Sequence, residues 1–306
     1  MIRFLEHSEI DKTAWDLCIQ SSVESSVYAQ SWYLDIVSPG WNALVKDSYT
    51  SVFPLTQRKK WGIKYLFQPA FTQQLGMFST EKKDDRLLSA FLLAIPESYK
   101  LIEIQINGGN TGSYIPSSFE VKEKITHHLN LEQPFEELKK NFSENTKRNI
   151  KLFDKSSYKI NNDGDPGELV QLFKENRGKH INQLGKNDYA MFLEICHVAG
   201  QRNLIKCMQV RNSENKLSAG AIFIKTHSGY ILLFTGLSEE GKSSGAMSAI
   251  LAQFISDQSG SQGVLDFEGS MDPGVARFYK SFGSHEIVYL QIRKNRLPLP
   301  LRWLKN

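Results

Sequence analysis

Residues 218–291 constrain the fold of this chain more than any other stretch, because strands and helices follow one another there in a clear order. The pattern predicts this succession: strands at 218–226 and 230–236, a polar loop at 237–245, a helix at 246–257, a strand at 264–267, a helix at 273–282 and a strand at 287–292. Strands joined by short turns pair antiparallel. Elsewhere helices and strands mix without a strict βαβ order, so the sequence predicts the α+β class, with mixed α/β sheets.

The length of the chain, 306 residues, is long for one domain and sufficient for two. The first half alternates short strands and helices. The second half begins near residue 130 with two polar, basic helices at 135–141 and 143–154. We therefore predict one domain at residues 1–128 and a second at residues 129–306.

Composition argues against several classes of protein. Lys and Arg number 37 against 33 Asp and Glu, and a net charge of +4 gives no reason to expect DNA or a membrane as a partner. Cys18, Cys196 and Cys207 are too scattered for a disulfide framework, which fits a reducing compartment. No HExxH or CxxC pattern indicates a metal site. The N-terminus lacks an apolar signal segment and apolar runs such as 90–96 are too short to span a membrane, so we expect a cytoplasmic protein.

The loop at 237–245 joins a strand to the N-terminus of a helix. Backbone N–H groups and the helix dipole at such a junction attract an anion, and Lys242 could add a positive charge. The alternative is a plain strand-to-helix connection in which Ser243 or Ser244 caps the helix. On the first interpretation, the residues that would bind the anionic part of a donor are Gly236, Leu237, Lys242, Ser243, Ser244 and Gly245.

Two carboxylates stand at the end of the next strand. Alternation places Asp266 and Glu268 on the same face, and Tyr279 follows on a short helix. A carboxylate facing a tyrosine could act as base and acid. The alternative is a salt bridge from either carboxylate to Arg277 or Lys280, with Tyr279 packed in a core.

The order strand, anion loop, helix, strand, then A-x-x-Y-x-x-x-G at Ala276, Tyr279 and Gly283 resembles the core of the GNAT acyltransferase superfamily. The stretch LDFEGSMDPGVARFYKSFG at 265–283 is similar to the Fem-type branch, which holds the peptidoglycan-bridge aminoacyl transferases. The segment NTKRNIK at 145–151 also resembles the basic helix that opens the second Fem-type domain. The resemblance implies two GNAT-like domains in tandem, each a mostly antiparallel mixed sheet flanked by helices.

The resemblance also implies roles for site residues. Glu268 would take a proton from the acceptor amine through water, with Asp266 as the reserve base. Tyr279 stands where GNAT enzymes carry the tyrosine that reprotonates the leaving thiolate. Arg148 and Lys280 would bind the substrate. No metal and no permanently bound cofactor are expected, and acyl-CoA is the expected co-substrate.

Three functions follow from these residues. The first is transfer of an acyl or aminoacyl group from a thioester or ester, preferably acyl-CoA, to the amine of a small molecule or cell-wall precursor. The second is an aminoacyl-tRNA-dependent transferase of the peptidoglycan-bridge type. The third is a non-catalytic ligand-binding protein on the same scaffold. The basic stretch 139–159 could bind phosphates of a nucleotide-linked precursor or of tRNA, or it could be a solvated helix face. We interpret residues 58–60 as a hairpin tip, and we expect the basic tail 293–306 to lie as coil on the protein body.

Overall fold

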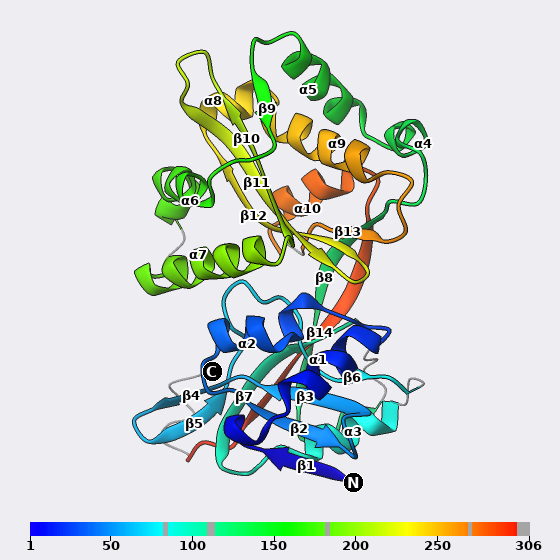
Figure 1. Ribbon diagram of the computed structural model, residues 1–306, viewed down its shortest axis with the longest axis vertical. Coiled ribbons are helices and arrows are strands. Elements are labelled where there is room, and N and C mark those ends of the chain that lie inside the picture. The colour runs from blue at the N-terminus through cyan, green and yellow to red at the C-terminus, as the bar shows by residue number, and fades with distance from the viewer. Residues whose placement is uncertain (82–84, 109–113, 181–183, 269–270, 299–306) are drawn as a thin grey trace. The chain divides into compact units, whose positions relative to one another are not determined.

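The computed structural model describes residues 1–81, 85–108, 114–180, 184–268 and 271–298. They form two compact units (Figure 1). Unit 1 contains residues 1–125 and the described residues from Val288 onward, and unit 2 contains residues 126–287. The chain therefore crosses between units twice, within β8 (Glu120–Asn130) and within β14 (His285–Asn295). The predicted division after residue 128 falls inside β8, but the return of the C-terminal strand to unit 1 was not predicted.

Unit 1 holds two sheets, in the orders β1-β2-β3-β6 and β4-β5-β7-β14. Its helices are amphipathic: α3 buries Leu88, Phe91 and Leu92 against the core. Helix α1 begins where Asp11 accepts hydrogen bonds from the N–H groups of two first-turn residues. The elements of unit 1 are β1 (Ile2–Leu5), α1 (Lys12–Ser21), α2 (Ser31–Val37), β2 (Asn42–Lys46), β3 (Ser51–Leu55), β4 (Gln57–Lys60), β5 (Ile63–Leu66), β6 (Phe78–Ser79), α3 (Asp85–Ala94) and β7 (Tyr99–Ile106).

Unit 2 has one sheet in the order β8-β13-β12-β11-β10-β9. Helices α6 and α7 cover one face, and α5, α9 and α10 lie on the other (Figure 1). Helix α9 is buried over most of its length, apart from polar residues such as Gln253 and Asp257, and Phe254 stacks on Phe223 of the sheet. The elements are α4 (Phe135–Lys140), α5 (Glu144–Asp154), β9 (Lys159–Asn161), α6 (Pro166–Glu175), α7 (Lys186–Gln201), β10 (Ile205–Arg211), β11 (Leu217–Thr226), β12 (Gly229–Leu237), α8 (Glu239–Ser243), α9 (Ala246–Gln258), β13 (Val264–Asp266) and α10 (Pro273–Lys280).

The mixed α/β class is confirmed, since antiparallel pairs dominate both units and the pairs β5–β7 and β12–β13 are parallel. Several local predictions need correction. Strands β6, β8 and β9 were not predicted, and residues 58–60 belong to β4 rather than to the hairpin tip. The polar loop contains helix α8, because Ser238 caps it by accepting from the N–H of Gly241. Strand β13 ends at Asp266, one residue before the predicted end. Strand β14 continues to Asn295, into the segment predicted as coil, while residues 299–306 of that segment lie outside the described residues.

Candidate active site

Strands β12 and β13 separate partway along the sheet of unit 2. They pair in parallel only from Gly229 to Ile231 on β12. Beyond Ile231, β12 stays paired with β11 through Leu232 and residues 234–237, but it no longer pairs with β13. The β11–β12 register also shifts between Ile222 and Phe223, so that Leu233 is an extra residue in β12. Such a bulge bends a strand, and here it coincides with the separation of the two strands.

A cavity of about 820 Å³ borders the end of β12, beyond its pairing with β13. The end of β12, the start of α9, helix α10 and a short 3-10 helix, η4 (Arg177–His180), form most of its wall, and α5, α6 and α8 add further residues. All of these elements belong to unit 2. The main lining residues are Thr235, Leu237, Met247, Ser248, Val275, Phe278, Tyr279, Arg177 and Lys179.

The first turn of α9 borders this cavity. Gly245 precedes the helix with φ 76° and provides no side-chain cap. A Cβ atom at Gly245 would lie 2.3 Å from the carbonyl oxygen of Asn149 on α5, so only glycine fits. The first three N–H groups of a helix have no intrahelical acceptor. Met247 and the buried Ser248, both in that turn, line the cavity, which makes this wall attractive to an anion.

The predicted anion loop is partly corrected by this geometry. The N–H groups of Lys242, Ser244 and Gly245 bond to carbonyls within the α8 segment, so the first turn of α9 offers the open donors instead. Of the predicted donor-binding residues, Leu237, Lys242 and Gly245 line the cavity. Gly236 packs against Leu169 of α6, and the hydroxyls of Ser243 and Ser244 donate to carbonyls within α8.

Tyr279 forms part of the cavity wall. Its ring stacks on Phe267 with centroids 5.1 Å apart, which fixes its orientation. Its hydroxyl has no hydrogen-bond partner among the described residues. Burial raises the pKa of Tyr279 well above its ordinary value, and the nearby charge of Glu268 raises it further. Tyr279 therefore keeps its proton at neutral pH and can donate it to a group in the cavity.

The two predicted carboxylates lie behind this wall rather than on it. Asp266 accepts a hydrogen bond from Thr126 Oγ1 at 2.5 Å and another from the N–H of Glu268 at 2.8 Å. His128 Nε2 lies 3.2 Å from the other oxygen of Asp266. Glu268 has φ 57° at the end of β13, and burial raises its pKa to about 8. Neither carboxylate lines the cavity, so contact with a substrate there would need a water between them.

Strand β8 brings Thr126, His127 and His128 to this cluster, and none of them was predicted to belong to it. His127 is fully buried, its ring lies 6.2 Å from that of Tyr279, and neither ring nitrogen has a hydrogen-bond partner in the described part of the chain. Burial lowers the pKa of His127, so the ring is neutral at pH 7. The paired histidines were the one available signal in the sequence.

The predicted substrate-binding residues lie elsewhere. The Arg148 side chain donates to Asn145 Oδ1 on the exposed face of α5, and Lys280 Nζ lies 2.7 Å from Glu286. The cations on the cavity wall are Arg177, Lys179 and Lys242. Arg177 lies 3.2 Å from Asp272, the N-cap of α10, and so links η4 to that helix. Only Lys242 of these three was predicted, because η4 carries no motif.

Two other features are absent from the described residues. No group of three or more His, Cys, Asp or Glu side chains could hold a metal ion there. Within the same residues, no helix has the length and apolar character needed to cross a membrane.

No protein-family model matches the sequence, and no curated protein is similar to it in sequence. Solved structures match in fold. FemX matches over 97% of this chain and 98% of its own, with a TM-score of 0.66 at 12% identity. L-PGS from Bacillus licheniformis matches over 89% of each chain, with a TM-score of 0.54 at 12% identity. A conserved protein of unknown function from Bacteroides thetaiotaomicron matches over 96% and 99%, with a TM-score of 0.62 at 11% identity. The predicted Fem-type fold is thereby confirmed.

Proposed function

We propose that the protein transfers an acyl group from an acyl-CoA thioester to the amine of an acceptor. The observation that carries this proposal is the cavity beside the part of β12 that β13 does not pair, with Tyr279 in its wall. An extended donor arm rich in amides can lie along this part of β12, as an added strand would. Its carbonyl would then be polarised by backbone N–H groups.

The phosphates of such a donor fit the other end of the cavity. The open N–H groups at the start of α9 attract anions, and Lys242 and Lys179 line the same cavity. The Gly245 position lets the backbone of α5 and the first turn of α9 approach closely. CoA is therefore the co-substrate we propose, bound for each turnover and not permanently.

The chemistry requires one new bond and one broken bond. The acceptor nitrogen attacks the carbonyl carbon, the carbon–sulfur bond breaks, and the thiolate takes the proton of the Tyr279 hydroxyl. The amine loses its proton through water to the ionised form of Glu268. With a pKa of about 8, that form makes up roughly a tenth of the Glu268 population at pH 7. Turnover therefore rises with pH until about pH 8.

Two measurements test the proposal. CoA at about 100 times its dissociation constant should raise the free energy of unfolding by ~2.7 kcal/mol. Release of free thiol from acetyl-CoA, with a panel of amines, should fall about 10²–10⁴-fold in Tyr279→Phe, as expected for loss of a general acid. Tyr230→Phe is the matched control, because Tyr230 lies on β12 against Phe254 and does not line the cavity. Thiol release at the wild-type rate in Tyr279→Phe would refute the role of Tyr279.

An aminoacyl ester of tRNA is the second candidate donor. Arg177, Lys179 and Lys242 line the cavity, and so does Asn149 of the basic helix α5. This candidate predicts tRNA binding whose affinity falls steeply with salt and is reduced by Lys151→Gln on α5. Stabilisation by CoA without thiol release for any amine would instead favour the non-catalytic ligand-binding protein.

A further inference from the structure

The hairpin of β4 and β5 in unit 1 ends in an exposed tryptophan. Trp61 is 82% exposed and has φ 52°, followed by Gly62 with φ 80°. Two successive residues with positive φ form a tight two-residue turn, whose favoured sequence is Asn-Gly. Trp61 stands where Asn is favoured, and bulky residues fit the left-handed conformation poorly. The hairpin thus holds a large apolar side chain in water at a position where its backbone is also disfavoured. Lys60 Nζ contacts the ring, 4.8 Å from its centroid, and such cation–π contacts are weak at exposed sites.

The same hairpin is strongly basic. Residues 57–66 contain Arg58, Lys59, Lys60 and Lys64 and no acidic residue. Lys59 stands directly opposite Lys64 across the two strands, an arrangement of like charges that destabilises a strand pair. We call these four cations, with Trp61, the basic hairpin. Within the described parts of the chain, none of the four forms an ion pair.

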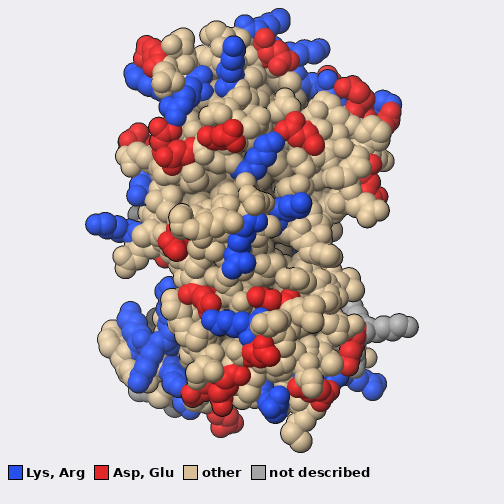
Figure 2. All heavy atoms as spheres, viewed as in Figure 1, with Lys and Arg blue, Asp and Glu red and all other residues tan. Residues whose placement is uncertain are grey.

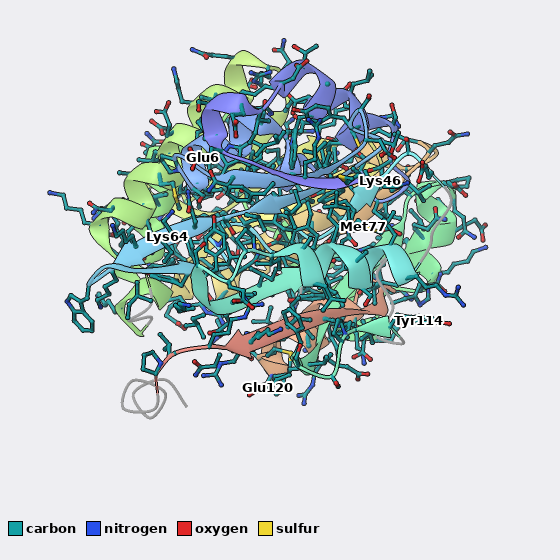
Figure 3. All side chains as sticks on the ribbon, turned by 90° about the horizontal axis from the view of Figure 1, so that it is seen from below. Glu6, Lys46, Lys64, Met77, Tyr114 and Glu120 are labelled. Atoms are coloured by element: carbon teal, nitrogen blue, oxygen red, sulfur yellow. The ribbon has the colours of Figure 1, made fainter. Side chains whose placement is uncertain are left out.

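The cations gather on one edge of unit 1. Figure 2 shows Lys and Arg side chains clustered where Figure 1 places β4 and β5, and Figure 3 shows Lys64 on the projecting strand pair. Lys100, at the start of the neighbouring strand β7, joins them around a cavity of about 450 Å³. Lys59, Lys64 and Lys100 line this cavity, and among the described residues no carboxylate does. A cavity with three ammonium groups in its wall fits the phosphate of an anionic ligand.

We propose that the basic hairpin docks unit 1 on an anionic membrane surface. The lysines would contact lipid phosphates, and Trp61 would lie at headgroup level, where its amphipathic ring is favoured. Strand β4 is also a sheet edge, where lysines discourage pairing with other sheets. Protection of the sheet edge would explain the lysines of β4, but it would not explain the exposed tryptophan at the hairpin tip. The separation of charge and apolar surface along one hairpin is the pattern of a peripheral membrane contact.

Vesicle sedimentation of the full chain tests this inference. We expect binding to vesicles with about a third phosphatidylserine in phosphatidylcholine, and much weaker binding to phosphatidylcholine alone. Lys59→Gln with Lys64→Gln should weaken binding about 25-fold, since each basic residue near such a surface contributes about fivefold. Lys186→Gln with Lys225→Gln removes the same charge from exposed positions of unit 2 and should change binding less than about twofold. Equal losses in the two double variants would overturn the proposal.

Trp61→Asn separates docking from folding. Asparagine tolerates the left-handed conformation, so the variant keeps or gains thermal stability while losing affinity for anionic vesicles. Vesicles with brominated lipids should quench Trp61 fluorescence in the wild type and not in this variant. Unchanged vesicle affinity in Trp61→Asn would contradict the inference. Preferential binding of the basic hairpin to tRNA, when tRNA and anionic vesicles compete for it, would also contradict the inference. Neither result bears on CoA binding in unit 2.

Discussion

Glu268→Gln should change how the stability of the protein depends on pH. Burial raises the pKa of Glu268 from 4.5 to about 8 in the folded protein, while the unfolded chain retains the ordinary value. Between these two values the unfolded chain has released the proton and the folded protein has kept it. The free energy of unfolding therefore falls as pH rises, by up to ~1.4 kcal/mol per pH unit.

The expected loss is about 3 kcal/mol between pH 4.5 and pH 7, since 2.5 pH units lie between them. Glutamine does not titrate, so Glu268→Gln removes this contribution and gains stability relative to the wild type as pH rises. Urea unfolding at pH 5, 6, 7 and 8 measures the difference between the two proteins. Other titrating groups are present in both, and their contributions cancel.

Glu240→Gln is the matched control. Hydrogen bonds from Tyr158 and Asn212 hold the pKa of the Glu240 carboxyl below its ordinary value, so Glu240 does not titrate between pH 5 and pH 8. This variant should keep the wild-type slope. If the stability difference between Glu268→Gln and the wild type stays constant from pH 5 to pH 8, Glu268 is not desolvated and cannot set the pH dependence of turnover.

Three further outcomes follow from close contacts. Gly245→Ala should lower the free energy of unfolding in urea more than Gly40→Ala does. Both positions have positive φ, but only a Cβ at Gly245 would meet the Asn149 carbonyl. Equal losses of unfolding free energy in the two variants would contradict this close approach. Phe254→Ala should cost ~3–5 kcal/mol, since the Phe254 ring stacks on Phe223 at 3.6 Å, and a loss below about 1 kcal/mol in the same assay would refute that packing. Burial raises the pKa of the Cys18 thiol to about 11 and the pKa of the Cys196 and Cys207 thiols to about 12. A thiol reagent at pH 7.5 should therefore modify these cysteines only after the protein unfolds.

The sequence predicted best where periodicity and turn signals agreed. Strands β10, β11 and β12 and helix α9 were found because alternation and a buried apolar run are local properties. Strand β8 was missed because Glu120, Lys122 and Lys124 share one face of its exposed half, and only its second half enters the core. The alternation that identifies a strand was therefore absent over half its length.

The candidate site was predicted in part for the same reason. Tyr279, Leu237, Lys242 and Gly245 were found because a sequence motif spans them, and they meet at one cavity. Arg177 and Lys179 reach it from a segment without a motif, and His127 reaches the cluster behind it from a strand that pairs with β13. Contacts between segments so far apart depend on strand pairing, which local composition does not determine.

Left-handed backbone occurs at both proposed sites. Among the described residues, five bulky or acidic side chains have positive φ: Asp47, Tyr49, Trp61, Phe71 and Glu268. The tyrosine hydroxyl of Tyr49 accepts a hydrogen bond from the Asp11 N–H, and the Phe71 carbonyl accepts one from Tyr33. The Glu268 N–H donates to Asp266, and the largely exposed Trp61 ring contacts the Lys60 ammonium. Residues in this conformation are enriched at functional positions, which agrees with the place of Trp61 at the proposed membrane contact and of Glu268 beside the proposed acyl-transfer cavity.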